Sequence, residues 1–122
     1  MFFPPMIGYL VVAAVTVLLL IGINRKTIHR NRTIGIRTKH TLGSDEAWDR
    51  GHRAAAPYVL AMTVIAISHA VALVSIEALG LAQTAGHIVA VSGWILVVAC
   101  CVFAWRTADS AAKASPPHPR IR

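Results

Sequence analysis

The chain has 122 residues and a formal net charge of +7; 56% of its residues are hydrophobic and only 14% are charged. Soluble domains carry about 45–50% apolar and about 25% charged residues, so this composition excludes an ordinary soluble enzyme. The two cysteines, Cys100 and Cys101, are adjacent. Because neighbouring cysteines rarely pair with each other, a secreted disulfide scaffold is excluded too. The length fits one domain.

Three stretches of the sequence contain no Asp, Glu, Lys or Arg. They cover residues 1–24, 54–76 and 78–105. A bilayer core about 30 Å thick needs about 20 mainly apolar residues in a helix, so each stretch is long enough to cross a membrane. The sequence therefore predicts an all-α membrane protein with three transmembrane helices, over residues 5–23, 57–79 and 85–105.

The first apolar stretch has two interpretations, a signal peptide or a retained anchor helix. Nothing basic precedes it, no A-x-A-like site ends it, and Arg25 and Lys26 follow it. This pattern favours the anchor helix, because signal peptides have a basic start and a cleavage site of small residues. Pro4 and Pro5 are compatible with this helix, since proline is tolerated in a first helical turn.

The basic side chains indicate how the chain crosses the membrane. Residues 25–53 hold eight basic and three acidic side chains, and residues 106–122 hold four basic and one acidic. Three spans place both segments on the same side, which the positive-inside rule makes the cytoplasm. We therefore expect an external N-terminus, a cytoplasmic loop over residues 24–56 and a cytoplasmic C-terminus. The final segment, residues 111–122, is basic and Pro-rich, and we expect no fixed fold there.

A short cytoplasmic amphipathic helix is predicted just before the second span. Ser44 is a good N-cap residue, and Asp45 and Glu46 put negative charge in the first turn. We expect this helix to lie at the membrane surface over residues 45–53. Pro57 is expected to bend its junction with the span, because proline removes one helical hydrogen bond.

The sequence gives no sign of a catalytic, metal or nucleotide site. It contains no C-x-x-C, H-E-x-x-H or G-x-x-x-x-G-K pattern, and its histidines never lie four residues apart, as a helical metal pair would need. The basic loop has one aromatic residue, Trp48, and therefore no array for stacking nucleic-acid bases. We expect no enzyme activity, no cofactor and no nucleic-acid partner. Anionic lipid headgroups are the expected partners of the basic side chains.

Ser68, His69 and Ser92 are polar residues well inside the predicted spans. His69 is the one ionisable side chain near the middle of a span, and such groups face protein or water because exposure to lipid is costly. It could be a proton-responsive or ligand-contacting group. The alternative is a neutral imidazole that bonds to Ser92 or to a backbone carbonyl and holds helices together. The alternative is favoured, because no acidic residue lies near His69 in the sequence to form a relay.

Small residues recur at helical spacing in the second and third spans. They are Ala66 and Ala70 in the second span and Gly86, Ala90 and Gly93 in the third. Such faces allow close packing between membrane helices. The spacing leaves open whether they pack on another span of this chain or on a different protein. Because three spans offer little internal interface, we expect a lateral partner, either another membrane protein or a second copy of the chain.

The cytoplasmic loop contains an ordered set of polar and aromatic residues. From residue 31 to residue 52 it reads NRTIGIRTKHTLGSDEAWDRGH. This loop resembles the SdpI-like family of bacterial membrane proteins, whose recurrent pattern is an Asn, a Gly-x-Arg-Thr, then a Ser, a Trp and an Asn or His just before a span. The matching residues, called the motif residues below, are Asn31, Gly35, Arg37, Thr38, Ser44, Trp48 and His52.

The resemblance implies a non-enzymatic role in immunity or signalling at a bacterial cell membrane. The family's named member protects its producer against a secreted peptide toxin and holds a transcriptional repressor at the membrane. The alternative is a structural accessory subunit of a larger bacterial membrane complex, held by the small-residue faces. In physical terms Gly35 permits a tight turn, Arg37 can hold carbonyls or a phosphate, and Trp48 and His52 share one helix face. We expect the motif residues to form a folded lid over the helix bundle, and this lid to be the functional surface.

Overall fold

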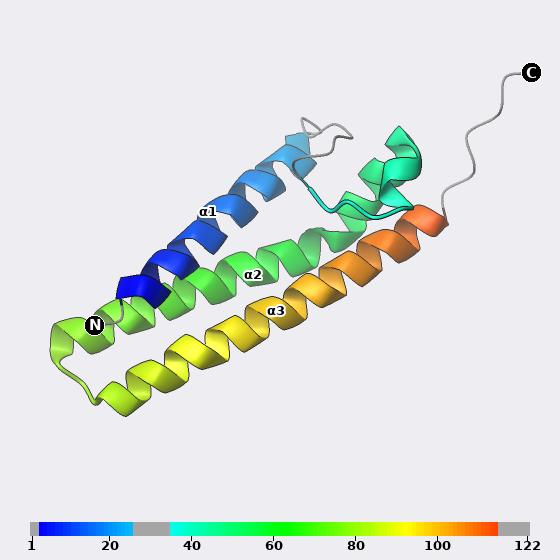
Figure 1. Cartoon of the computed structure of the whole chain (residues 1–122). Coiled ribbons are helices and arrows are strands. Elements are labelled where there is room, and N and C mark those ends of the chain that lie inside the picture. The colour runs from blue at the N-terminus through cyan, green and yellow to red at the C-terminus, as the bar shows by residue number, and fades with distance from the viewer. Residues whose placement is uncertain (1–2, 26–34, 115–122) are drawn as a thin grey trace, which may run out of the picture.

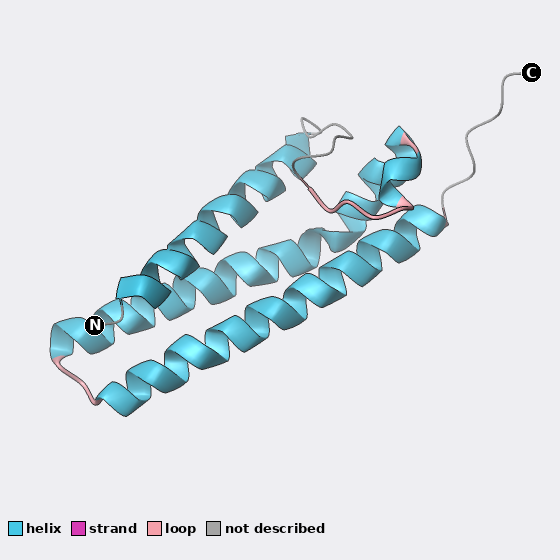
Figure 2. Cartoon of the chain, in the orientation of Figure 1, coloured by secondary structure: helices cyan, strands magenta, loops and turns pink. Residues whose placement is uncertain are grey.

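The computed structural model describes residues 3–25 and 35–114, and this part of the chain is helical without any strand (Figure 2). The elements in chain order are α1 (Phe3–Arg25), the 3-10 turn η1 (Thr41–Gly43), α2 (Asp45–Leu79) and α3 (Gln83–Lys113). Each of the three long helices is long and apolar enough to cross a membrane. The all-α fold with three membrane-crossing helices is therefore confirmed.

The long helix α2 packs against both α1 and α3 (Figure 1). The chain reverses direction between successive helices, so the start of α1 and the α2–α3 turn share one end of the bundle, called the turn end. Residues 35–44 and the C-terminal end of α3 lie at the other, called the loop end. Near the turn end α1 also reaches α3, where the Tyr9 hydroxyl donates a hydrogen bond to the carbonyl of Ala90 and the Tyr9 ring stacks on Trp94 at 5.0 Å.

A tight glycine turn joins α2 to α3. Gly80 has a φ of 61°, and its N–H donates to the carbonyl of Glu77 at 3.4 Å. The next N–H, of Leu81, donates to the carbonyl of Ile76 at 3.0 Å. These two bonds form a Schellman motif, which satisfies the last carbonyls of the helix and suits glycine because its φ is positive. The turn places α3 antiparallel beside α2.

The short separate helix predicted before the second span is not supported. Residues 45–53 are the first turns of α2, which continues through Pro57 to Leu79 without a break. Proline removes only one backbone hydrogen bond, and Pro57 lies on an exposed face of the helix. Trp48 and Ala55 on the opposite face are buried against the rest of the bundle. This packing extends through the proline and favours one continuous helix.

At the other end of the chain, α3 extends further than predicted. It ends at Lys113, so the segment expected to lack a fixed fold does not begin at residue 111. Ala108 and Ala112 are buried, which explains why the helix continues beyond the apolar stretch. Residues 115–122 lie outside the described residues.

The small-residue faces pack inside this chain. Ala66, Ala70 and Ala90 are buried, and so are Gly86 and Gly93. Large apolar side chains on all three long helices point outward instead. Examples are Leu18, Val71 and Ile95, which are 68%, 60% and 64% exposed. Soluble monomers rarely expose apolar surface on this scale, whereas lipid tails cover it at no cost.

Candidate functional site

The segment at residues 35–44, called the docked loop below, is held on α2 by the imidazole of His52. The N–H of Ile36 donates to Nε2 of His52 at 2.9 Å, and Nδ1 of His52 lies 2.8 Å from the carbonyl of Trp48. Because a carbonyl only accepts, Nδ1 holds the proton and Nε2 offers a lone pair. The neutral imidazole therefore satisfies both bonds, and protonation would break the bond to the loop.

The environment of His52 favours this neutral form. His52 lies outside the apolar span predicted at residues 57–79, but its side chain is buried. Burial lowers the pKa of His52 below its ordinary value, while the Trp48 carbonyl and the charge of Asp49 act in the opposite direction and do not outweigh it. The docked loop is therefore held by a base that stays uncharged at neutral pH.

Gly35 starts the docked loop in a conformation that side chains rarely adopt. Its φ is 109°, and its Cα faces the rings of Trp48 and His52, which are tilted by 37° to each other with their centroids 4.2 Å apart. A Cβ at this position would lie 2.7 Å from Nε2 of His52 and 2.8 Å from Cζ2 of Trp48. Both rings are buried, so they have no room to retreat. The backbone angle and the close approach together require glycine.

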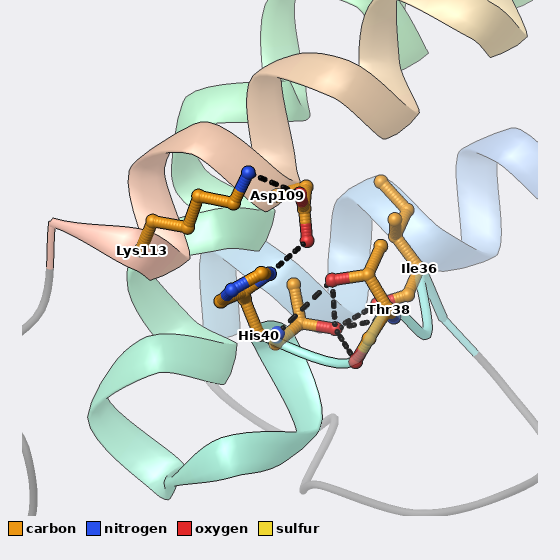
Figure 3. A network of polar contacts seen from close by, with 6 residues as sticks. Ile36, Thr38, His40, Asp109 and Lys113 are labelled. Carbon is orange, nitrogen blue, oxygen red and sulfur yellow. Dashed lines mark hydrogen bonds and ion pairs between the residues drawn. The ribbon is translucent and has the colours of Figure 1, made fainter.

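Two threonines close the docked loop on itself (Figure 3). The N–H of Thr38 donates to Oγ1 of Thr41 at 2.7 Å, and the N–H of Thr41 donates to Oγ1 of Thr38 at 3.1 Å. The Thr41 hydroxyl also donates to the carbonyl of Ile36 at 2.9 Å. Thr41 is completely buried, and its hydroxyl satisfies one backbone N–H and one backbone carbonyl of the loop.

Ser44 ends the docked loop and begins α2. Its Oγ accepts a hydrogen bond from the N–H of Ala47 at 3.0 Å, and its carbonyl accepts one from the N–H of Trp48 at 3.0 Å. These bonds satisfy free donors of the first helical turn, so the predicted N-cap is confirmed. Asp45 and Glu46 follow in the first turn, where negative charge is favourable.

Asp109 joins the docked loop to the end of α3 (Figure 3). Nδ1 of His40 lies 2.9 Å from its Oδ1, and Nζ of Lys113 lies 3.5 Å from its Oδ2. A hydrogen bond from the Thr38 hydroxyl contributes most to lowering the pKa of Asp109, and the hydrogen bond and charge of His40 and the charge of Lys113 lower it further. The carboxylate is therefore ionised at neutral pH and accepts bonds from two residues of the loop.

Gly51 brings α2 and α3 close together beside Asp109. A Cβ on Gly51 would lie 2.9 Å from the carbonyl oxygen of Ala108 and 2.9 Å from Cγ2 of Thr41. Glycine at this position therefore lets the backbone of α3 and the docked loop meet on the same face of α2. The end of α3, far away in the sequence, therefore meets the docked loop and the start of α2 there.

A cavity of about 290 Å³ lies beside the docked loop, between the three long helices. Arg37 is exposed and lines this cavity with its two loop neighbours. The lining residues are Leu19 of α1; Gly35, Ile36 and Arg37 of the docked loop; Val59 and Met62 of α2; and Cys101, Ala104 and Trp105 of α3.

Comparison with known proteins gives this arrangement a family. The model of the SdpI/YfhL protein family matches residues 27–107. This chain belongs to the SdpI/YfhL family. The match covers the docked loop, all of α2 and most of α3, so the resemblance drawn from the motif residues is confirmed. No curated protein and no solved structure matches the chain.

Six of the seven family motif residues lie at the loop end. Gly35, Thr38, Trp48 and His52 are brought together in the docking contacts described above. Ser44 caps α2, and Arg37 lines the cavity. Asn31 lies outside the described residues.

Two residues of the site were missed by the sequence analysis: Thr41 and Asp109. Thr41 pairs with Thr38, which lies three residues earlier. This spacing is common in polar loops, so it does not by itself predict a hydrogen bond between the two side chains. Asp109 offered a better signal, since it is the only acidic residue after Glu77. A single carboxylate in a basic segment needs a basic or hydroxyl partner, and the loop supplies both.

The side chains of Ser68, His69 and Ser92 bond to carbonyls of their own helices. Nδ1 of His69 donates to the carbonyl of Ile65 at 2.7 Å, so its partner is a backbone carbonyl and not Ser92. Its ring lies 5.5 Å from the ring of Tyr9 on α1. The hydroxyls of Ser68 and Ser92 donate to carbonyls at 2.7 Å and 3.2 Å. These residues lie away from the docked loop and are not brought together with the motif.

Within residues 3–25 and 35–114, no group of three or more His, Cys, Asp or Glu side chains is placed to hold a metal ion. Cys100 and Cys101 are free thiols, and Sγ of Cys101 lies 3.3 Å from Sδ of Met62 at the cavity wall.

Proposed function

We propose that this chain is a non-enzymatic membrane protein of the SdpI type that acts in immunity or signalling through its docked loop. The single observation that supports this is the arrangement of the motif. The contacts of Gly35, Trp48 and His52 fix the position of the loop. The fixed loop holds exposed Arg37 beside a cavity. A charge held in a fixed position beside an apolar cavity is suited to the recognition of a partner.

The proposed location is a bacterial cell membrane, with the loop end in the cytoplasm and the start of α1 outside. The support is the concentration of basic residues in the two segments that meet at the loop end. Single cysteines at Lys39 and Gln83, both exposed, test this in a Cys100→Ser, Cys101→Ser background. A membrane-impermeant maleimide should label position 83 in intact cells and position 39 only after lysis. Labelling of position 39 from outside would overturn the orientation.

The functional test is a challenge with secreted, membrane-active peptide toxins. A bacterium lacking the gene should become more sensitive, and expression of the parent chain should restore resistance. Arg37→Ala should fail to restore it, while Lys39→Ala should restore it. Lys39 is the matched control, because it is an exposed basic residue of the same loop that does not line the cavity. Equal behaviour of the two variants would overturn the proposed role of Arg37, and unchanged sensitivity on deletion would overturn immunity.

The alternative function, a structural accessory subunit, relied on small-residue faces that would bind a partner. Those faces are buried within this chain, so a partner helix would need another surface. A pull-down in mild detergent separates the two functions. A stoichiometric complex of large mass would favour the accessory subunit, and a single 13.1 kDa species would remove it.

A further inference from the structure

The cavity beside Arg37 is open at its rim and closed at its floor. Val59 and Met62 of α2 form part of the floor and are buried. Trp105 at the rim is 52% exposed, and Cys101 on the same helix is exposed too. Leu19 of α1 lines the cavity across from α3, with α2 between them. The cavity is therefore a groove on the surface of the helix bundle, called the groove below. The docked loop covers it at the loop end.

The two ends of this groove differ in chemistry. Below the loop its walls are mainly apolar residues of three helices, while Arg37 of the docked loop is the charged residue of the lining. A guanidinium has five N–H donors in a fork that fits a phosphate, so it can bind an anion in addition to its other contacts. Trp105, next to Arg106 at the end of the apolar stretch, is the kind of residue that marks the headgroup level of a membrane.

A second cavity differs from this groove in the charge of its lining. It lies near the turn end and is lined by Pro5 and by apolar residues of α3 only, with no charged group. Lipid tails of any kind can cover that surface. The groove at the loop end combines an apolar wall with a fixed positive charge, which selects an occupant with a negative head and an apolar tail.

We propose that this groove binds one phospholipid with an anionic headgroup, its phosphate on Arg37 and part of one acyl chain against Leu19, Met62 and Ala104. The charge complementarity at the rim and the apolar walls below it support a lipid over a soluble anion. This inference stands apart from the proposed immunity or signalling role, because lipid binding is measured on the purified chain without any toxin.

Native mass spectrometry of the full chain in detergent tests the proposal with two probes, dioleoyl phosphatidylglycerol and dioleoyl phosphatidylcholine. We expect one phosphatidylglycerol to bind at least about tenfold more tightly than phosphatidylcholine. Both lipids carry the phosphate, but the positive choline group offsets its charge and repels the guanidinium, whereas the glycerol headgroup is uncharged. Arg37→Gln should weaken phosphatidylglycerol binding about tenfold, and Lys39→Gln should leave it within about twofold. Equal effects of the two variants would overturn the site.

A second pair of variants tests the groove itself. Cys101→Phe places a large ring at the groove wall, whereas Val102→Phe places the same ring on the neighbouring residue, which is 50% exposed and does not line the groove. Only Cys101→Phe should lower phosphatidylglycerol binding. Displacement of the lipid by millimolar inorganic phosphate would show a simple anion site. Capture of a second copy of the chain or of another protein in place of the lipid would also overturn the proposal.

Discussion

Replacing Gly35 by alanine should release the docked loop from α2. A non-glycine residue at a φ of 109° costs roughly 1–3 kcal/mol of backbone strain. The added Cβ would lie 2.7 Å from Nε2 of His52 and 2.8 Å from the ring of Trp48, and overpacking of this kind costs about 1–3 kcal/mol. Trp48 is only 1% exposed, so its ring has no space into which to move. Together the two effects should weaken docking by about 2–6 kcal/mol.

Hydrogen exchange at the Ile36 amide in detergent micelles measures this loss, because that amide is protected by its bond to His52. A loss of about 2 kcal/mol would speed exchange about 30-fold. Gly43→Ala is the matched control, since no atom lies within 4 Å of a Cβ at that position and its φ is not positive. Its effect should stay within about 0.5 kcal/mol. Equal exchange in the two variants would refute the close-approach argument.

Three further predictions concern Thr41, His52 and Gly93; Gly43→Ala is the control for the first and the third, and His52→Asn for the second. Thr41→Val removes a completely buried hydroxyl that bonds one amide and one carbonyl of the loop, so docking should weaken by about 1–3 kcal/mol in the same exchange experiment. Lowering the pH from about 7.5 to about 5 should also release the loop, because the pKa of His52 is lowered in the folded state. The stabilisation that neutral His52 gives to docking is complete above the ordinary histidine pKa of about 6.5 and is lost as the pH falls below that value. A similar pH dependence in a His52→Asn variant would contradict this. Gly93→Ala should lower the Tm in detergent, through a loss of about 1–3 kcal/mol, because its Cβ would overlap the Tyr9 hydroxyl on α1; an unchanged Tm would contradict that packing.

The transmembrane architecture could be predicted because it depends on composition over long stretches. Runs of 24, 23 and 28 residues without charge can hardly fold as anything but membrane helices. The helix ends could not be predicted in the same way. α2 begins at Asp45, well before its apolar stretch, and passes through Pro57, because buried contacts of its first turns stabilise the helix where hydropathy gives no signal. Tertiary packing decided these ends.

The candidate site likewise has one part that the sequence predicts and another part that it does not. Ser44, Trp48 and His52 lie on one segment, so the cap and the shared helix face could be predicted from spacing alone. The bond from His40 to Asp109 joins residues 69 positions apart, and no local pattern predicts such a contact. The fold brings them together because the α2–α3 turn returns the end of α3 to the loop end (Figure 1).

The motif residues have two different roles, fixing the loop and presenting a charge, and variants should be interpreted according to the role that they change. Gly35, Thr38, Trp48 and His52 act on the loop's own position, so changing any of them moves Arg37 as well. Arg37→Ala changes the exposed charge and leaves the docking contacts of those four residues in place. If a toxin-resistance assay responds to Arg37→Ala while exchange at the Ile36 amide does not, the guanidinium is the recognition group. If toxin resistance instead falls in step with faster exchange of the Ile36 amide across all variants, and Arg37→Ala leaves resistance unchanged, the position of the loop alone determines recognition.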